Sequence, residues 1–306
     1  MKQLALHGLD DIVEIGSEEQ ENKLLFIGLD MTKACNMNCI YCFESAGKRD
    51  SGELTRAEKI DILNQALKLG AKSLVIAGAG EPLLDSDFEE VIKYAYNSGM
   101  VSVVYTNGSL IDEKMARFMF GNNVTPIVKL DSLRPEIQDY YTRSRGSQQK
   151  SLQAIERLSK AGYSKTNGRI TRIATASLYI KSNLDEIPRI VDWCLQRNIK
   201  PTVDIIGIHG RAIKYEDEIK PTREEILRVM NQVTCEESAC SHKGCIVWKY
   251  GLFIGNKGDA KFCSEIPADI GNIRQKTLKE LLEIKQMKYP VRIGEFTCPV
   301  KERFYT

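Results

Sequence analysis

The part of the sequence best suited to chemistry is a loop with three cysteines, Cys35, Cys39 and Cys42, at CX3CX2C spacing. Three thiolates so close together can ligate one iron–sulfur cluster, whose usual complement is four cysteines. One iron would then lack a protein ligand, and an open coordination position distinguishes a catalytic metal site from a closed structural one. A structural zinc site is the alternative, but zinc ligands usually come as two pairs, and no second pair follows nearby. The spacing therefore predicts a catalytic iron–sulfur centre.

With Tyr41 just before the third cysteine, the motif resembles the signature of the radical S-adenosylmethionine (radical SAM) superfamily. The resemblance implies that Cys35, Cys39 and Cys42 hold a [4Fe-4S] cluster, and that Tyr41 belongs to the cofactor site. In that family the open iron binds the amino and carboxylate groups of SAM. Reductive cleavage then gives methionine and a 5′-deoxyadenosyl radical, which abstracts hydrogen from the substrate. A reducing partner such as flavodoxin or ferredoxin is implied as well.

Elements that position this loop follow from hydrophobic periodicity. A mostly apolar run over 24–30 predicts a strand buried on both faces, which leads directly into the cysteines. Thr55 and Glu58 form a predicted capping box for a helix that ends at Leu69, before Gly70. Strands and helices then alternate: strands over 73–77, 101–105, 126–130, 173–179 and 202–206, and helices over 87–98, 112–119, 151–161 and 184–197.

Six strands that alternate with helices predict an α/β fold with a parallel sheet and right-handed crossovers. The resemblance implies a partial (β/α)6 barrel, whereas periodicity alone would equally allow a doubly wound open sheet. We expect three parts: an N-terminal cap over 1–23, the barrel core over 24–213 and an auxiliary-cluster domain over 214–306.

Ligands of parallel α/β sheets bind beyond the carboxyl ends of the strands. Residues 78–82, Gly-Ala-Gly-Glu-Pro, follow the second strand and resemble the family's GGEP motif, with Ala79 and Gly80 departing from the plain string. The resemblance implies that Gly78, Gly80 and Glu81 bind SAM, with the Glu81 carboxylate on its ammonium. Thr106 and Asn107 resemble the family's TNG turn, and Ser177 and Asn183 lie where related enzymes bind the SAM ribose and carboxylate. An ordinary βα turn is the alternative at each position.

Further candidates follow the fourth and sixth strands. Lys129 and Asp131 lie in a stretch that resembles the SLDS segment of cofactor-maturing members, and are substrate-site candidates or a surface salt bridge. Residues 207–212 have the form GxxGRA, and the resemblance implies that Gly207 and Arg211 belong to the cofactor site, where the glycines let backbone groups approach the adenine. Arg211 is otherwise a structural ion-pair partner. His209 is a candidate proton acceptor or simply a loop histidine.

Five of the nine cysteines lie in the last part of the chain, and they predict a second metal site. Cys245 and Cys263 fit the CX9-15GX4C opening of SPASM and twitch domains, and strands over 250–254 and 260–262 would form a hairpin between them. The shorter twitch form fits better, with one auxiliary cluster, Cys298 as third ligand and a helix over 277–284. Cys240 or Cys235 would be the fourth ligand, or the fourth iron stays open and binds substrate.

The remaining thiols bear on the outcome of the reaction. Whichever of Cys235 and Cys240 is not a ligand could return a hydrogen atom to a substrate radical, which would make the enzyme an epimerase. An electron passed to the auxiliary cluster would instead make it a dehydrogenase. Cys194 lies beside Trp193 on the apolar side of a helix and is expected to be a core residue.

The composition and length of the chain limit which partners and substrates are expected. Lys plus Arg number 43 against 41 Asp plus Glu, so no charge excess favours nucleic acid. Without a signal peptide or an apolar run near the ~20 residues of a membrane span, we expect a cytoplasmic protein. Only 34 residues precede Cys35, which favours a small polar substrate such as an aminocyclitol, sugar or nucleoside over a ribosomally synthesised peptide. A maturase of such a peptide is the second hypothesis, and a non-catalytic metal-binding module the third.

Overall fold

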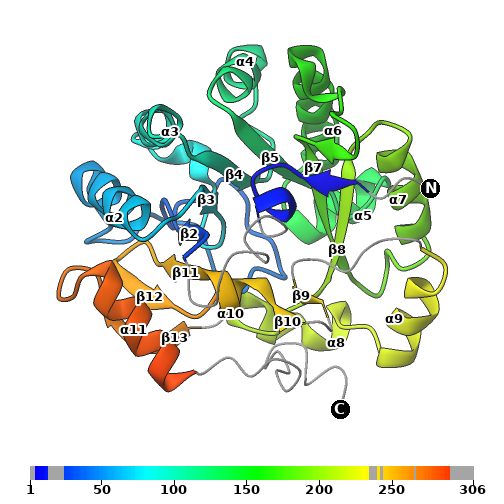
Figure 1. Ribbon diagram of the computed structural model, residues 1–306. Coiled ribbons are helices and arrows are strands. Elements are labelled where there is room, and N and C mark those ends of the chain that lie inside the picture. Colours follow the sequence, from blue (N-terminus) through cyan, green and yellow to red (C-terminus); the bar gives the residue numbers. More distant parts are fainter. Residues whose placement is uncertain (1–3, 13–23, 234–239, 242–243, 265–266, 290–306) are drawn as a thin grey trace.

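The computed structural model describes residues 4–12, 24–233, 240–241, 244–264 and 267–289. Six of its strands are parallel and follow one another in chain order across one curved sheet (Figure 1): β2 (Phe26–Leu29), β3 (Ser73–Ile76), β4 (Val101–Thr106), β5 (Val124–Lys129), β7 (Ala174–Tyr179) and β8 (Lys200–Ile205). A doubly wound sheet would reverse its strand order at a switch point, and this order does not reverse. The six predicted strands and the barrel-type order are confirmed.

The strands described do not close into a barrel. β2 pairs on its free side with β11 (Gly251–Ile254), in parallel, and the sheet continues antiparallel through β12 (Asp259–Lys261) to β13 (Pro267–Asn272). The predicted C-terminal hairpin is therefore confirmed as β11 and β12. Its strands extend the barrel sheet, a pairing that joins segments more than two hundred residues apart and that no local pattern indicates.

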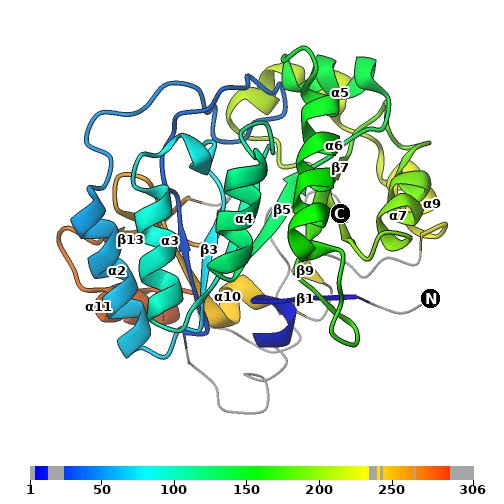
Figure 2. The ribbon, with the colours of Figure 1, turned by 90° about the horizontal axis from the view of Figure 1, so that it is seen from above.

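Helices cover the outer face of this sheet, and Figures 1 and 2 show four of them side by side around its curve. The helices that follow the strands are α2 (Arg56–Lys68), α3 (Phe88–Asn97), α4 (Glu113–Gly121), α5 (Pro135–Thr142), α6 (Ser147–Leu158) and α7 (Ile187–Leu195). The predicted capping box of α2 is confirmed, with the Glu58 carboxylate accepting from Thr55 N at 2.7 Å. α5 was absent from the prediction, although Pro135 occupies its first turn, a common helix start.

Two apolar clusters lie on the two faces of the sheet, because successive side chains of a strand point to opposite sides. On β3, Leu74 and Ile76 pack in the larger cluster with Leu63 of α2 and Ile92 of α3. Val75, between them, belongs to the smaller cluster inside the barrel. Burial of each such aliphatic side chain contributes about 1.5–3 kcal/mol. Both faces of the central strands are therefore covered, as their continuous apolar runs predict.

The described part of the predicted N-terminal cap, residues 4–12, lies across the amino ends of the strands. Its strand β1 (Ala5–Leu6) pairs in parallel with β6 (Ile170–Thr171). The Ser73 hydroxyl donates to Gly8 O at 2.6 Å, and Lys200 pairs with Asp10. This segment therefore closes the end of the barrel opposite the cysteine loop.

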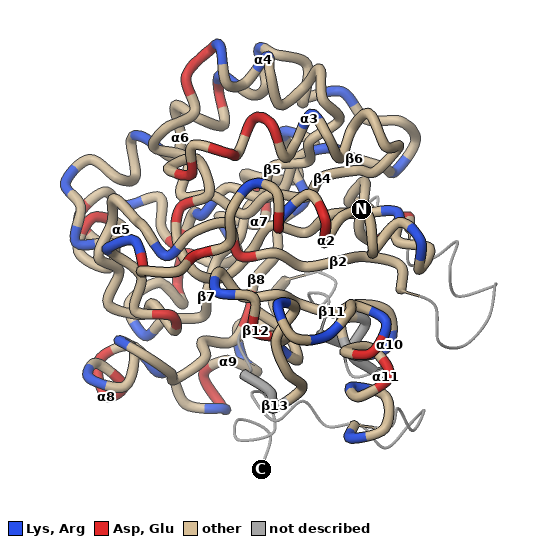
Figure 3. Tube along the Cα trace, turned by 90° about the vertical axis from the view of Figure 1, so that its left-hand side faces the viewer, with Lys and Arg blue, Asp and Glu red and all other residues tan. Residues whose placement is uncertain are grey.

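The other elements are short, apart from the last helix: η1 (Pro82–Leu84), the π-helical turn η2 (Ser159–Tyr163), η3 (Gly210–Tyr215), α8 (Glu216–Ile219), α9 (Arg223–Met230), β9 (Cys240–Ser241), β10 (Gly244–Cys245), α10 (Ile246–Tyr250) and α11 (Leu278–Lys288). α11 confirms the helix predicted over 277–284 and continues beyond it. Figure 3 shows basic and acidic residues interspersed along the trace. Among the described helices, none has the length and apolar run needed to cross a bilayer.

Candidate active site

The cysteine loop is held by backbone hydrogen bonds from two sides. Cys35 N donates to Gly47 O at 2.9 Å, which closes the loop on itself. Ile40 N donates to Tyr141 O at 2.9 Å, and Asn38 N to Thr142 O at 3.1 Å, so the end of α5 supports the middle of the loop. The helix that the sequence analysis missed is therefore one of the elements that position the thiols.

A third support comes from the Gly-Ala-Gly-Glu-Pro turn after β3. Glu81 N donates to Ala34 O at 2.8 Å. A Cβ atom at Gly80 would lie 2.3 Å from the same carbonyl oxygen and 2.6 Å from Thr32 O, so the two backbones can approach this closely only with glycine at position 80. Both Gly78 and Gly80 line the cavity next to the loop.

The GxxGRA turn after β8 supports the loop from a further side. A Cβ atom at Gly210 would lie 2.1 Å from Phe43 O. The Arg211 guanidinium donates to Cys39 O at 2.8 Å and to Ala46 O at 2.6 Å, and Arg211 N donates to Cys42 O at 3.0 Å. Arg211 thus clamps the loop that carries the thiols through its backbone carbonyls, and its predicted place in the cofactor site stays a prediction. Gly207 does line the cavity.

The three thiols line one cavity and are partly exposed to it. Burial, together with neighbouring thiols, raises the pKa of Cys39 to about 12 and also raises the pKa of Cys35. A bound metal reverses this effect because it stabilises thiolates. No three His, Cys, Asp or Glu side chains of the described residues are arranged around a single ion. A cluster bonds each thiolate to a different iron, and the three thiols at one cavity wall fit that donor set.

Glu81 is a buried carboxylate at the carboxyl end of β3. The Thr106 hydroxyl donates to Glu81 Oε1 at 2.7 Å, and Asn107 N donates to Oε2 at 2.8 Å. Burial raises the pKa of Glu81 to about 7, although these hydrogen bonds act in the opposite direction. The predicted GGEP-like and TNG-like turns are thus in direct contact at the cavity. The charge of Glu81 between them is poorly solvated unless a cation binds next to it.

Two asparagines join the TNG-like turn to the cysteine loop. Asn107 Nδ2 donates to Asn36 Oδ1 at 2.9 Å, and Asn36 Nδ2 donates to Ser109 Oγ at 2.8 Å. Neither Asn36 nor Ser109 was among the predicted site residues. The position of Asn36 directly after Cys35 is the signal in the sequence that could have indicated its role.

Tyr41, Lys129 and Asp131 form a buried network below the loop. The Tyr41 hydroxyl donates to Asp131 Oδ2 at 2.7 Å, and Lys129 Nζ lies 2.5 Å from Asp131 Oδ1. Burial and the Asp131 charge raise the pKa of Tyr41. Asp131 is fully buried and lies outside the lining of the cavity, whereas Lys129 and Tyr41 line it. Asp131 therefore holds two cavity residues in place, and its ion pair with Lys129 joins a buried carboxylate to a side chain that is 23% exposed. The role of Lys129 and Asp131 in substrate binding stays a prediction.

The other predicted polar residues have different surroundings. Ser177 lines the cavity, and its hydroxyl donates to Leu130 O at 2.5 Å. Asn183 is fully buried and donates to Asp131 O at 2.7 Å and to Leu178 O at 2.8 Å, so its amide stabilises a turn behind the cavity. His209 is exposed at the start of η3 and does not line the cavity.

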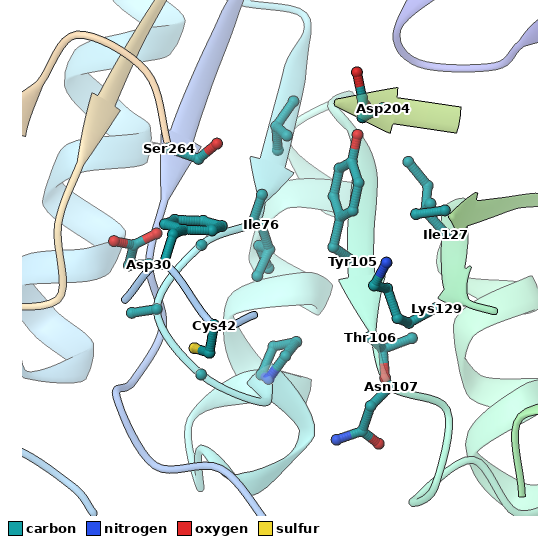
Figure 4. A pocket seen from close by; sticks show the side chains of 18 of the residues that line it. Asp30, Cys42, Ile76, Tyr105, Thr106, Asn107, Ile127, Lys129, Asp204 and Ser264 are labelled. Atoms are coloured by element: carbon teal, nitrogen blue, oxygen red, sulfur yellow. The ribbon is translucent and has the colours of Figure 1, made fainter. Parts of the chain in front are cut away.

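The cavity has a volume of about 360 Å³ and continues from the cysteine loop into the barrel. In Figure 4, Cys42 and Asn107 lie toward one end, while Tyr105 and Asp204 lie toward the other, with Lys129 between them. Most of the lining is apolar, and Leu6 of the N-terminal segment reaches it. A cavity of this size fits a small-molecule ligand or one side chain of a larger one. Tyr105 of β4 and Asp204 of β8 were not among the predicted site residues, because both lie within strands.

Of the predicted C-terminal ligands, Cys263 lines the same cavity as the three loop thiols. Cys240 and Cys245 are Cα partners in the antiparallel pair of β9 and β10. Cys235 and Cys298 lie outside the described residues. Cys194 is fully buried in α7, with its Sγ 3.2 Å from Thr175 Oγ1, and is a core residue as predicted.

Comparison with known proteins gives relatives of several activities. A mycofactocin maturase, MftC, of Mycolicibacterium smegmatis is 28% identical over 197 residues, 64% of this chain and 48% of that protein, so the chain spans about half of its length. A probable GTP 3′,8-cyclase of Methanococcus maripaludis is 24% identical over 240 residues, which cover 77% of this chain and 78% of the cyclase.

Among solved structures, Streptococcus suis SuiB bound to S-adenosylmethionine aligns with a TM-score of 0.69 at 17% identity, over 92% of this chain and 69% of SuiB. At that identity the likeness concerns the fold. The model of the radical SAM superfamily matches residues 29–194, more than half of the 306 residues. That range contains the cysteine loop, Glu81 and the TNG-like turn described above. The chain belongs to the radical SAM superfamily.

Proposed function

We propose that this radical SAM enzyme abstracts hydrogen from a small polar molecule held inside the barrel. The observation that carries the proposal is the continuity of the cavity, which runs from Cys35, Cys39 and Cys42 past Glu81 to Tyr105 and Asp204. A radical formed at one end of such a cavity reaches a substrate at the other end without crossing water.

Cys35, Cys39 and Cys42 would hold the [4Fe-4S] cluster, which supplies an electron and an open iron for SAM when bound. Glu81 lines the same cavity as these thiols, and Thr106 and Asn107 fix its orientation through the bonds at 2.7 and 2.8 Å. A carboxylate in this position would bind the SAM ammonium, because a cation favours the ionised form that burial disfavours. The apolar lining of the cavity excludes water.

The substrate class is supported by the size and polar groups of the inner cavity. The whole cavity measures about 360 Å³ and must also hold SAM, so the space beyond the SAM site favours a small substrate such as an aminocyclitol, a sugar or a nucleoside. The side chains of Tyr105, Lys129 and Asp204 lie along this space and offer donors and acceptors for hydroxyl or amino groups.

Oxidation or epimerisation would follow hydrogen abstraction, depending on the C-terminal cysteines. We propose one auxiliary iron–sulfur cluster on Cys245, Cys263 and Cys298. The backbone pairing of Cys240 with Cys245 supports Cys240 as the fourth ligand, and a closed cluster would accept the substrate electron. If Cys235 or Cys240 stays free and reaches the cavity, it would instead return a hydrogen atom, giving an epimerase.

A second candidate is a maturase that modifies a ribosomally synthesised peptide. The similarity to the mycofactocin maturase over 64% of this chain favours it. In that case one side chain of the peptide would occupy the inner cavity. The two candidates share the radical chemistry and differ in the size of what enters the barrel.

The radical chemistry is tested with anaerobically reconstituted protein, SAM and dithionite. We expect the wild type to form 5′-deoxyadenosine. Replacement of Cys35, Cys39 and Cys42 by Ala should lower the amount formed by at least about 100-fold, roughly the factor that one catalytic group supplies. Cys194→Ser is the matched control, because Cys194 lies in the core away from the cavity. Equal product from the triple variant would reject the assignment. A flavodoxin or ferredoxin in place of dithionite tests the proposed reductant.

The substrate class is tested by adding size-fractionated extract to the same reaction and measuring 5′-deoxyadenosine. We expect a small-molecule filtrate to stimulate the formation of 5′-deoxyadenosine even after the filtrate has been treated with protease. Stimulation that only a peptide fraction provides, and that protease abolishes, would reject the small-molecule proposal and favour the maturase.

A further inference from the structure

A buried group of three charges joins the C-terminal hairpin to the cysteine loop. Lys261 Nζ of β12 lies 2.7 Å from Asp30 Oδ2, at the end of β2, and 2.7 Å from Glu44 Oε1, two residues past Cys42. Lys261 is 231 positions from Asp30 and 217 positions from Glu44 along the chain. We refer to Lys261, Asp30 and Glu44 as the latch.

Two of the three latch side chains are almost fully enclosed, whereas that of Glu44 is 22% exposed. The side chain of Lys261 is 8% exposed and that of Asp30 is 1% exposed. Asp30 Oδ1 has no hydrogen-bond partner among the described residues, so Lys261 supplies the polar contact that fixes this carboxylate. Burial raises the pKa of Asp30 to about 7, and the contact with Lys261 acts in the opposite direction.

The hairpin that carries Lys261 is itself seated closely on β2. Lys261 is paired with Phe253 in β11, and Phe253 is paired with Gly28 in β2. A Cβ atom at Gly28 would lie 2.2 Å from the Phe253 ring, so the aromatic side chain occupies the space that glycine leaves. Cys263 follows Lys261 by two residues and lines the cavity that the loop thiols share.

Removal of Lys261 would leave two carboxylates close together in a poorly solvated place. Breaking a buried ion pair by removing one partner is strongly destabilising, because the remaining charge is uncompensated. Here the remaining charges belong to the two ends of the cysteine loop, one before Cys35 and one after Cys42. Loss of Lys261 therefore removes the contact that ties both ends of the loop to β12, while the rest of the barrel, which has its own core, persists.

We propose that Lys261 is a positioning residue that couples the C-terminal hairpin to the cysteine loop, so that the loop adopts its cluster-binding conformation only when β12 is docked. The proposal rests on the proposed function, because that function gives the loop its role in binding the cluster. The first test below does not depend on that function. The latch would make the two cofactor-binding parts of the chain interdependent.

The first test uses limited trypsin digestion of the apoprotein. Lys48 and Arg49 are exposed just past Glu44 and report opening of the loop, whereas Arg117 on α4 is a distant exposed reference site. We expect Lys261→Met to raise the cleavage rate at Lys48 and Arg49, relative to Arg117, by about tenfold. Lys279→Met, at an exposed position of α11, is the matched control and should leave the ratio unchanged.

A variant that balances the charges keeps the test decisive if Lys261→Met does not fold. Asp30→Asn, Glu44→Gln and Lys261→Met combined remove all three charges, and such replacements of buried ion groups are often neutral for stability. This variant should fold with a thermal midpoint near that of the wild type and still show the faster loop cleavage. A cleavage ratio within twofold of wild type in the folded variants would overturn the proposal.

The second test uses the reconstituted protein. The electron paramagnetic resonance spectrum of the reduced cluster should change when SAM binds to wild type and to Lys279→Met, and most of that change should be lost in the latch variants. A full SAM-dependent change in Lys261→Met would overturn the proposal even if stability falls. If wild type itself shows no cluster or no response to SAM, the proposed function fails, whereas the proteolysis result on the apoprotein still decides the coupling.

Discussion

The pKa of Glu81 predicts a specific effect of the Glu81→Gln substitution on stability. Burial raises the pKa of this carboxyl from 4.5 to about 7 in the folded protein. Between these two pH values the native state binds the proton and the unfolded state does not, so stability falls as pH rises through this window. At 1.36 kcal/mol per pH unit, the ionisation of Glu81 destabilises the apoprotein by about 3 kcal/mol once the pH exceeds 7.

A glutamine at position 81 can make the same hydrogen bonds as the protonated form of Glu81, but it has no proton to lose as the pH rises. Its oxygen can accept from Asn107 N, and its amide nitrogen can donate to Thr106 Oγ1, in place of the bonds that Glu81 makes at 2.8 and 2.7 Å. We therefore expect Glu81→Gln and wild type to have equal unfolding free energies at about pH 4 and below, where the carboxyl is protonated in both states. At pH 8 the variant should be more stable by up to about 3 kcal/mol, because only the wild type has lost the proton.

The assay is urea unfolding of the apoprotein at a series of pH values from 4 to 8. Other titrating groups, such as Asp30, are present in both proteins and cancel in the difference. Glu89→Gln is the matched control, since Glu89 is an exposed residue of α3 near Lys93, and its stability should follow wild type within about 0.5 kcal/mol. Parallel pH profiles for wild type and Glu81→Gln would refute the reasoning, because Glu81 would then titrate as an ordinary carboxylate.

Three further predictions concern the supports of the cysteine loop and the second cluster. Gly80→Ala should destabilise the apoprotein by about 3 kcal/mol or more in urea unfolding, because its Cβ would lie 2.3 Å from Ala34 O; a loss below 1 kcal/mol would contradict the close approach. Arg211→Met should lower stability by about 2 kcal/mol and reduce bound iron after reconstitution, since two hydrogen bonds to the loop are lost, and unchanged iron would argue against the clamp. Cys263→Ser should lower total iron while 5′-deoxyadenosine still forms, and unchanged iron would remove Cys263 from the ligands of a second cluster.

The sequence alone was sufficient for what depends on residue type and local period. The CX3CX2C spacing brings three thiols into one loop whatever the rest of the chain does, and the structure places all three at one cavity. The strands and most helices of the barrel followed from apolar runs and from caps such as Thr55 with Glu58. The short helix α5 escaped because eight residues carry too little periodicity to stand out from a loop.

The tertiary structure decided where the side chains of the turns point and what they contact. Arg211 donates to the cysteine loop, Asp131 lies behind Tyr41, and Lys261 pairs with Asp30 across the sheet. None of these contacts follows a helical or strand period, because each depends on which strands are neighbours and in which register they pair. The chemistry of the site could be predicted because thiols are reactive wherever they lie together. Its architecture could not, because burial and hydrogen-bond partners come from segments that only the folded sheet brings side by side.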